Sequence, residues 1–373
     1  MKPEYIVIQC NENKIYVRES VIPLLSEVDV IVFDCDGVLL DVQKQYRQAA
    51  AWTTCAIVKA FTGVTLPMAL FDDGLNFAYK RTGGMNNDWD LTYALAMRVL
   101  ASSPETCEIN RLARRSMGLD LPQRLKYIGE NSVEACIPVG GLRGELLSFA
   151  ASLDDTGVEA VDGRLLPGMA DVKRALGHPG GVGESIVSTM FEEVFGGAAL
   201  FEEAFGIPAR LTDAERGYVD EGRVEVVEQT IDRLEEIIGG SRFGVASGSP
   251  SNTARHLLGS ILDRFKPEAQ VWLEDVKEEE NRLGRVDLGK PNPYSLTRSA
   301  EAYHPYKRAL YVGDTVADML MAERVGGRYL FMGVYGCAAS SEAAREAFME
   351  AGCGIVAQSV NDLPAALRVG GAR

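Results

Sequence analysis

The chain has 373 residues, of which 46% are apolar and 24% are charged, and its formal net charge at pH 7 is −15. This length exceeds one ordinary domain and the composition is typical of a folded, soluble protein, so we expect two domains or one domain with a large insertion. The acidic charge argues against nucleic acid as the main partner, because binding to a phosphate backbone needs a basic surface.

The sequence also bears on the compartment. It contains no run of eighteen apolar residues, and its first residues lack the order of a signal peptide, so we expect no membrane partner and no secretion. The seven cysteines are dispersed and form no Cys-x-x-Cys pair. Such a pattern is typical of free thiols in a reducing compartment. The expected location is therefore the cytoplasm.

The first elements in chain order are short strands. Residues 5–9 and 14–18 flank a polar turn, which predicts a hairpin that we interpret as an addition to the edge of a sheet. Residues 28–33 form a continuous apolar and β-branched run, which is typical of a buried parallel strand. This strand ends in Asp34-Cys-Asp-Gly37, where the glycine permits a sharp turn.

The character of the sequence changes between residues 42 and 225. Helical patterns at 43–62, 91–100 and 133–151 are separated by loops rich in glycine and asparagine, and strands do not alternate with helices. We therefore predict a mostly helical inserted domain at 42–225. The core would comprise residues 1–41 and 226–373, with an N-terminal β extension at 1–27.

Strands and helices alternate after residue 225. Helices are predicted at 227–238, 252–262, 293–302 and 317–325, and strands at 242–246, 269–273, 309–312 and 328–332. This alternation predicts an α/β fold with a parallel, doubly wound, Rossmann-like sheet and right-handed crossovers. Open sheets of this kind bind their ligands beyond the carboxyl ends of the strands.

Two carboxylates follow the first core strand. Asp34 and Asp36 lie two residues apart on a turn, so both can face one point above the sheet. One can attack phosphorus while the other gives a proton to the leaving oxygen. The alternative is a solvated acidic turn, because Asp-x-Asp-Gly is short enough to arise by chance.

Two further segments suit phosphate. Ser247 and Gly248 lie where the second core strand turns into a helix, and a hydroxyl with backbone N–H groups at such a turn can cradle a phosphate. Ser249 or Ser251 could equally cap that helix. Lys290 stands before two prolines that begin the next helix, so it lies just before a helix in the following crossover.

The last segment is acidic. Asp314 follows a glycine at the end of the strand at 309–312, and Asp318 lies one helical turn later on the same face. Asp318 could equally be a helix N-terminal residue that interacts favourably with the helix dipole. Asp314 is harder to explain by a purely structural role.

The four segments together resemble a known family. Their order is Asp34-x-Asp-Gly-Val, Ser247-Gly-Ser, Gly-Lys290-Pro-x-Pro and Gly-Asp314-x-x-x-Asp318. This order resembles the signature of the haloacid dehalogenase (HAD) superfamily, over a core of about half the chain. The helical insert after the first strand resembles the cap domain of the group that contains phosphoglycolate phosphatase and β-phosphoglucomutase.

The resemblance implies a role for each matching residue in phosphoryl transfer. Asp34 would be the nucleophile and Asp36 the general acid and base. Ser247, Gly248 and Lys290 would hold the oxygens of the phosphoryl group.

The resemblance also implies a Mg²⁺ cofactor. Asp34 and Asp314 would bind the ion directly, Asp36 would offer its backbone carbonyl, and Asp318 would act through water or orient the other ligands. Oxygen ligands of this kind suit Mg²⁺.

The expected activity is hydrolysis of a small phosphate monoester through an aspartyl-phosphate. A phosphomutase of the β-phosphoglucomutase type would use the same residues, and a non-catalytic binding protein on this scaffold is a third option. Dehalogenases of the superfamily lack the second acid, so the presence of Asp36 disfavours dehalogenation. The expected partner is a small phosphorylated metabolite, and a homo-oligomer is compatible with the sequence.

One segment of the insert, at residues 79–90, concentrates cations, amides, glycines and a tryptophan. Such a loop can close over a site, with a cation meeting phosphate and an amide or aromatic ring touching the leaving group. The candidate substrate residues are Lys80, Arg81, Asn86, Asn87 and Trp89. The alternative is a structured turn in which Asp88 caps a helix that starts near Trp89.

Overall fold

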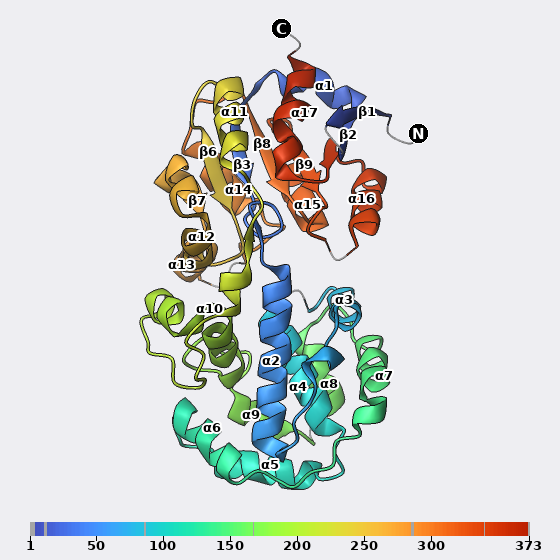
Figure 1. The fold of residues 1–373 in the computed structure, drawn as a ribbon, viewed down its shortest axis with the longest axis vertical. Coiled ribbons are helices and arrows are strands. Elements are labelled where there is room, and N and C mark those ends of the chain that lie inside the picture. Colours follow the sequence, from blue (N-terminus) through green and yellow to red (C-terminus); the bar gives the residue numbers. More distant parts are fainter. Residues whose placement is uncertain are drawn as a thin grey trace. The chain divides into compact units, whose positions relative to one another are not determined.

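The chain folds into two compact units. The computed structural model describes residues 4–10, 13–85, 87–166, 168–284, 287–338 and 340–371. The first unit comprises Met1–Gln43 and Gly222–Arg373, and the second comprises Lys44–Glu221. The chain therefore leaves the first unit after Gln43 and returns to it at Gly222 (Figure 1).

The described part of the first unit is built on an eight-stranded sheet with the order β1-β2-β10-β9-β8-β3-β6-β7. The strands are β1 (Tyr5–Cys10), β2 (Asn13–Arg18), β3 (Val28–Phe33), β6 (Phe243–Ala246), β7 (Gln270–Val271), β8 (Arg308–Gly313), β9 (Tyr329–Val334) and β10 (Ile355–Ala357). The six strands from β10 to β7 pair in parallel. The predicted doubly wound α/β core is thereby confirmed.

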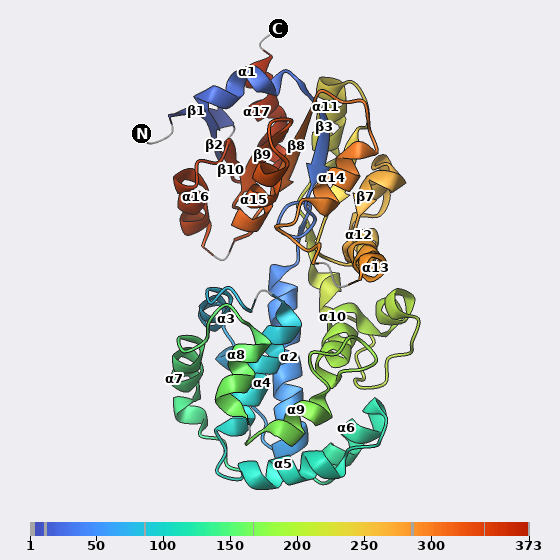
Figure 2. The same cartoon turned by 180° about the vertical axis from the view of Figure 1, so that it is seen from behind.

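Helices cover both faces of this sheet (Figure 1, Figure 2). They are α1 (Ile22–Leu25), α11 (Glu228–Ile238), α12 (Ser251–Leu258), α13 (Leu273–Leu283), α14 (Tyr294–Glu301), α15 (Val316–Val325), α16 (Ser341–Glu350) and α17 (Leu363–Gly370). On one face α11 packs against β3 and α17, while on the other α14 packs against β3 and β6, and α15 against β8 and β9. The strands are apolar on both sides because each face is covered.

The N-terminal hairpin extends the edge of the sheet. Strands β1 and β2 pair antiparallel, and β2 pairs antiparallel with β10. Ile15 and Val17 of β2 are fully buried, whereas Val7 of the outer strand β1 is exposed. A separate antiparallel pair, β4 (Leu40–Asp41) with β5 (Arg223–Val224), joins the outgoing and returning chain segments within the first unit.

The second unit is helical, and its described residues contain no strand. Its helices are α2 (Gln43–Thr62, which begins in the first unit), α3 (Asp73–Lys80), α4 (Asp88–Ala101), α5 (Thr106–Arg115), α6 (Leu121–Glu130), α7 (Val139–Ala150), α8 (Val158–Leu165), α9 (Ala170–Leu176) and α10 (Ile186–Phe205). Ile57, Phe61 and Leu95 are among the residues of its apolar core. Among the described helices, none is both long enough and apolar enough to cross a membrane.

Short 3₁₀ helices complete the described chain. They span Glu19–Val21, Met68–Leu70, Tyr218–Glu221, Gly259–Arg264, Pro267–Ala269 and Val360–Asp362. The predicted helix at 252–262 is therefore two elements, because α12 ends at Leu258 and Gly259 adopts a φ of +48° that an α-helix does not tolerate.

Two other predicted elements are wrong at their boundaries. The helix predicted at 133–151 begins only at Val139, since Pro138 disfavours helical backbone at the residue before it and lacks an N–H. The strand predicted at 269–273 shrinks to Gln270–Val271, and Leu273 instead begins α13. Asp275 fixes that helix start, because its Oδ2 accepts a hydrogen bond of 2.9 Å from the Trp272 N–H.

Candidate active site

The acidic segments meet at the middle of the parallel sheet. Asp34 follows β3 and Asp314 follows the neighbouring strand β8, and the Asp34 N–H donates to the Val312 carbonyl at 2.8 Å. From β3 the sheet continues to β6 and β7 on one side, and from β8 to β9 and β10 on the other. Asp34 and Asp314 therefore lie where the strand order reverses, which is the usual ligand site of a doubly wound sheet.

Lys290 connects two of the acids. Its Nζ lies 2.8 Å from Asp34 Oδ1 and 2.7 Å from Asp318 Oδ1. The lysine side chain is only 16% exposed, so these ion pairs are screened little by solvent. Burial alone would lower the pKa of Lys290, but Asp318 and Asp34 outweigh it and raise that pKa above its ordinary value.

Asp318 is held on all sides by the protein. Besides Lys290, it accepts hydrogen bonds from the Tyr311 hydroxyl at 2.8 Å and from the Thr315 N–H at 3.0 Å and hydroxyl at 2.5 Å. Thr315 in turn caps α15 by accepting from the Asp318 N–H at 3.2 Å. Burial alone would raise the pKa of Asp318, but Lys290 and these hydrogen bonds hold it below its usual value. Lys290 is thereby held between Asp318 and Asp34.

Tyr311 is a site residue that sequence reasoning missed. It is fully buried in β8, its hydroxyl reaches Asp318, and the Lys290 Nζ lies 5.7 Å from the centre of its ring. The available signal was a hydroxyl in the otherwise apolar run at 309–312, which leads to Asp314, because a buried tyrosine hydroxyl needs a partner.

The serine turn reaches the second acid. The Ser249 hydroxyl donates to Asp36 Oδ2 at 2.5 Å, and the Ser249 N–H donates to Ser247 Oγ at 3.2 Å. Ser247 is buried, and the space where Gly248 would carry a side chain is open. Ser249, considered only as a helix cap, instead contacts Asp36, while the capping position of α12 is Pro250.

The Asp314 carboxylate is closely packed between Gly37 and Gln43. A Cβ added to Gly37, whose φ is +81°, would lie 2.1 Å from Asp314 Oδ2, so both the backbone conformation and the space require glycine here. The Gln43 side-chain N–H donates to the same oxygen at 3.2 Å.

These carboxylates form a set that fits a divalent cation. Oxygens of Asp34, Asp314 and Asp318 lie within 4.8 Å of one another. Burial raises the pKa of Asp34 to about 7 against the opposing effect of Lys290. Burial likewise raises the pKa of Asp314 well above its ordinary value, and Asp318 and Asp34 add to the shift. Acids with one nearby ammonium leave excess negative charge, and hard oxygen donors suit Mg²⁺.

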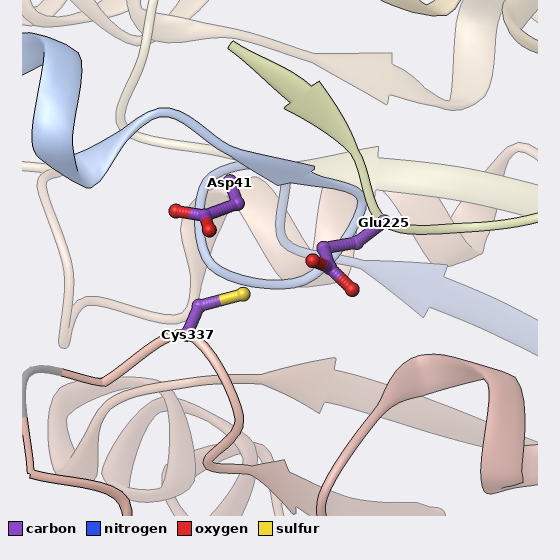
Figure 3. Close-up of side chains that lie close together, drawn as sticks. All are labelled: Asp41, Glu225 and Cys337. Carbon is purple, nitrogen blue, oxygen red and sulfur yellow. The ribbon is translucent and has the colours of Figure 1, made fainter.

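The first unit contains a second group of potential ligands. Figure 3 shows Asp41 on β4, Glu225 after β5 and Cys337 after β9, with ligand atoms within 4.8 Å of one another. Arg223 pairs with Glu225 and lies 3.5 Å from Asp41 Oδ2. Burial raises the pKa of the Cys337 thiol to about 12, so it is protonated near neutral pH. We interpret this group as an ion-pair cluster around Arg223.

The segment at 79–90 folds back on its own unit. Lys80 pairs with Asp88 at 2.9 Å, and the Trp89 indole N–H donates to Glu192 Oε1 at 2.8 Å. Asn87 caps α4 by accepting from the Trp89 N–H at 2.8 Å. The predicted Asp88 cap is therefore wrong by one residue, because Asp88 is already helical while Asn87 is extended.

The two other candidates of this segment are Arg81 and Asn86. Arg81 is exposed at the C-terminal end of α3. Asn86 lies outside the described residues.

Glu192 gives a prediction about stability. Burial raises its pKa to about 7, since the Trp89 hydrogen bond opposes the shift only in part. A raised carboxyl pKa in the folded state means that stability is lost as pH rises from the unfolded value of 4.5 through 7. Between pH 5 and pH 8 the unfolding free energy of the native protein should fall relative to Glu192→Gln by up to about 3 kcal/mol. Urea unfolding at several pH values measures this difference.

A variant of the adjacent Glu193 serves as the control for the Glu192→Gln comparison. Its carboxylate accepts from the backbone N–H groups of Arg210, Leu211 and Thr212 at 2.7–3.1 Å, so Glu193→Gln should destabilise the protein. A pH-independent difference between native protein and Glu192→Gln would contradict the interpretation.

Comparisons with known proteins bear on the sequence of part of the chain and on its fold. Residues 149–326 match the family model of haloacid dehalogenase-like hydrolases, a range that contains Ser247, Lys290, Asp314 and Asp318. A crystal structure solved as a target of the Northeast Structural Genomics Consortium has 21% sequence identity and a TM-score of 0.68, covering 91% of this chain and 98% of that one. No curated protein sequence matches. Over residues 149–326 the chain thus carries the pattern of a haloacid dehalogenase-like hydrolase, on an α/β fold that is also seen in a solved structure.

Proposed function

We propose that the protein is a Mg²⁺-dependent phosphatase that hydrolyses a small phosphate monoester through an aspartyl-phosphate on Asp34. The observation that carries this proposal is the convergence of Asp34, Lys290 and Asp314 at the carboxyl ends of two adjacent parallel strands. The helical second unit would be the cap domain, as in the group that contains phosphoglycolate phosphatase and β-phosphoglucomutase. The substrate would be a small phosphorylated metabolite of the cytoplasm.

The first half of the reaction forms the covalent intermediate. An oxygen of Asp34 attacks phosphorus, the bond between phosphorus and the leaving oxygen breaks, and Asp36 gives its proton to that oxygen. The Ser249 hydroxyl, at 2.5 Å from Asp36 Oδ2, orients the acid for this transfer. In the second half Asp36 takes a proton from water, which attacks phosphorus and releases Asp34 and inorganic phosphate.

Electrostatics decides whether the first step can occur. A carboxylate about 4 Å from a phosphate oxygen meets repulsion of about 4 kcal/mol per pair of unit charges at an effective dielectric constant near 20. Lys290, Ser247 and the backbone at Gly248 would stabilise the phosphoryl oxygens. Mg²⁺ held by Asp34, Asp314 and the Asp36 carbonyl, with Asp318 orienting the set, would supply the remaining positive charge.

The direct test is metal-dependent turnover. Purified protein with Mg²⁺ should release phosphate from p-nitrophenyl phosphate or from members of a broad phosphometabolite panel. Removal of divalent ions with EDTA should lower the rate by roughly 100-fold or more, and added Mg²⁺ should restore it. Release without a sugar bisphosphate activator would favour a phosphatase over a mutase. Absence of hydrolysis across the whole panel would overturn the proposal.

A further inference from the structure

Gln43 stands outside the four signature segments, yet its side chain reaches the candidate site. It is the first residue of α2 and the last residue of the N-terminal segment of the first unit. Its Nε2 donates a hydrogen bond of 3.2 Å to Asp314 Oδ2. Gln43 therefore contacts Asp314, a proposed metal ligand, although Gln43 itself belongs to a segment that has no assigned role.

Two other acids of the site, Asp34 and Asp318, are each held by more than one group. Asp34 Oδ1 receives the Cys35 N–H at 2.8 Å as well as Lys290, and Asp318 receives Tyr311, Thr315 and Lys290. Within the described parts of the chain, Gln43 is the side chain that donates a hydrogen bond to Asp314. The orientation of the Asp314 carboxylate thus depends on Gln43 and on the close contact with Gly37.

The chemical type of this donor also matters. An amide N–H fixes one carboxylate oxygen without adding positive charge, whereas a lysine or arginine in this place would compete with a cation. Gln43 engages Oδ2, which lies where a Cβ on Gly37 would be, and an oxygen of Asp314 lies within 4.8 Å of oxygens of Asp34 and Asp318. Partners that hydrogen-bond to a ligating carboxylate orient it and tune the affinity of the site.

We infer that Gln43 is a positioning residue, which orients Asp314 for Mg²⁺ and ties this ligand to the segment that enters the second unit. The inference rests on the proposed function, since it assigns Asp314 to the metal. In the proposed reaction Gln43 touches neither phosphorus nor the leaving group, so its effect falls on metal affinity rather than on the chemical step.

The test compares metal binding with turnover. Gln43→Met keeps the side-chain length and removes the donor, and Gln43→Ala removes both. Isothermal titration of metal-stripped protein with MgCl₂, without substrate, should show an affinity about 10- to 100-fold weaker in both variants. At saturating Mg²⁺ the KM for p-nitrophenyl phosphate should remain near the native value and kcat should largely recover.

Controls separate this effect from a general disturbance of the helix. Gln48→Ala changes the same residue type on the same helix and should leave Mg²⁺ affinity unchanged. Asp314→Asn, which alters the ligand itself, should weaken Mg²⁺ binding more than either Gln43 variant. If Gln43→Met binds Mg²⁺ as tightly as native protein, the inference about Gln43 is wrong, while the proposed function is unaffected. Native protein that neither binds Mg²⁺ nor hydrolyses any ester overturns the proposed function as well.

Discussion

Asp34→Asn should abolish ester hydrolysis, with a fall in kcat of about four decades or more, because hydrolases that lose their nucleophile suffer losses of this order. An amide oxygen is a far weaker nucleophile than a carboxylate, and the amide cannot form the acyl phosphate. Phosphate release measures the rate. Incubation with ³²P-labelled substrate followed by acid quench should label native protein and leave the variant unlabelled.

The variant should remain folded. Asparagine removes one buried negative charge from a site that has an excess of them, and Lys290 keeps its partner Asp318 at 2.7 Å. Asp29→Asn is a matched control, since Asp29 lies in the same strand but near its amino end, where it accepts from the Lys307 N–H at 3.0 Å. Near-normal turnover of Asp34→Asn would remove Asp34 from the chemistry and sink the proposed function.

Lys290→Ala should produce two losses from one change. Its kcat should fall by about two decades or more, as when a donor that stabilises a developing oxyanion is removed. The protein should also lose about 3–5 kcal/mol of unfolding free energy, because Asp34 and Asp318 would remain buried without their shared ammonium. Kinetics at saturating Mg²⁺ and urea unfolding in EDTA measure the two effects separately.

A double variant distinguishes the electrostatic role from the catalytic one. Adding Asp34→Asn to Lys290→Ala removes one of the stranded charges, so it should return part of the stability but none of the activity. Lys307→Ala, at an exposed lysine, should leave both properties unchanged. If Lys290→Ala unfolds at the same midpoint concentration of urea as the native protein, the ion pairs do not stabilise the site.

The sequence by itself determined the α/β class, the chain order of the four segments and the helical character of the insert. These features depend on short-range properties. The alternation of strand and helix patterns after residue 225 indicates a parallel sheet covered by helices. Gly37 indicates a turn that only glycine fits. Even the bounds of α2 could be derived, because its helical pattern is long and continuous. The boundaries near Pro138 and Leu273 could not be derived, because a proline and a capping carboxylate override the apolar pattern there.

Only the tertiary structure decided which atoms of the site meet. Lys290 lies between Asp34 and Asp318, and Gln43 reaches Asp314 from 271 positions away in the chain. Such contacts depend on the register of β3 against β8 and on where a helix begins above the sheet. A motif fixes only the spacing along the chain, whereas hydrogen bonds and ion pairs depend on distances of a few ångströms through space. For this reason Tyr311, Ser249 and Gln43 emerged from the fold.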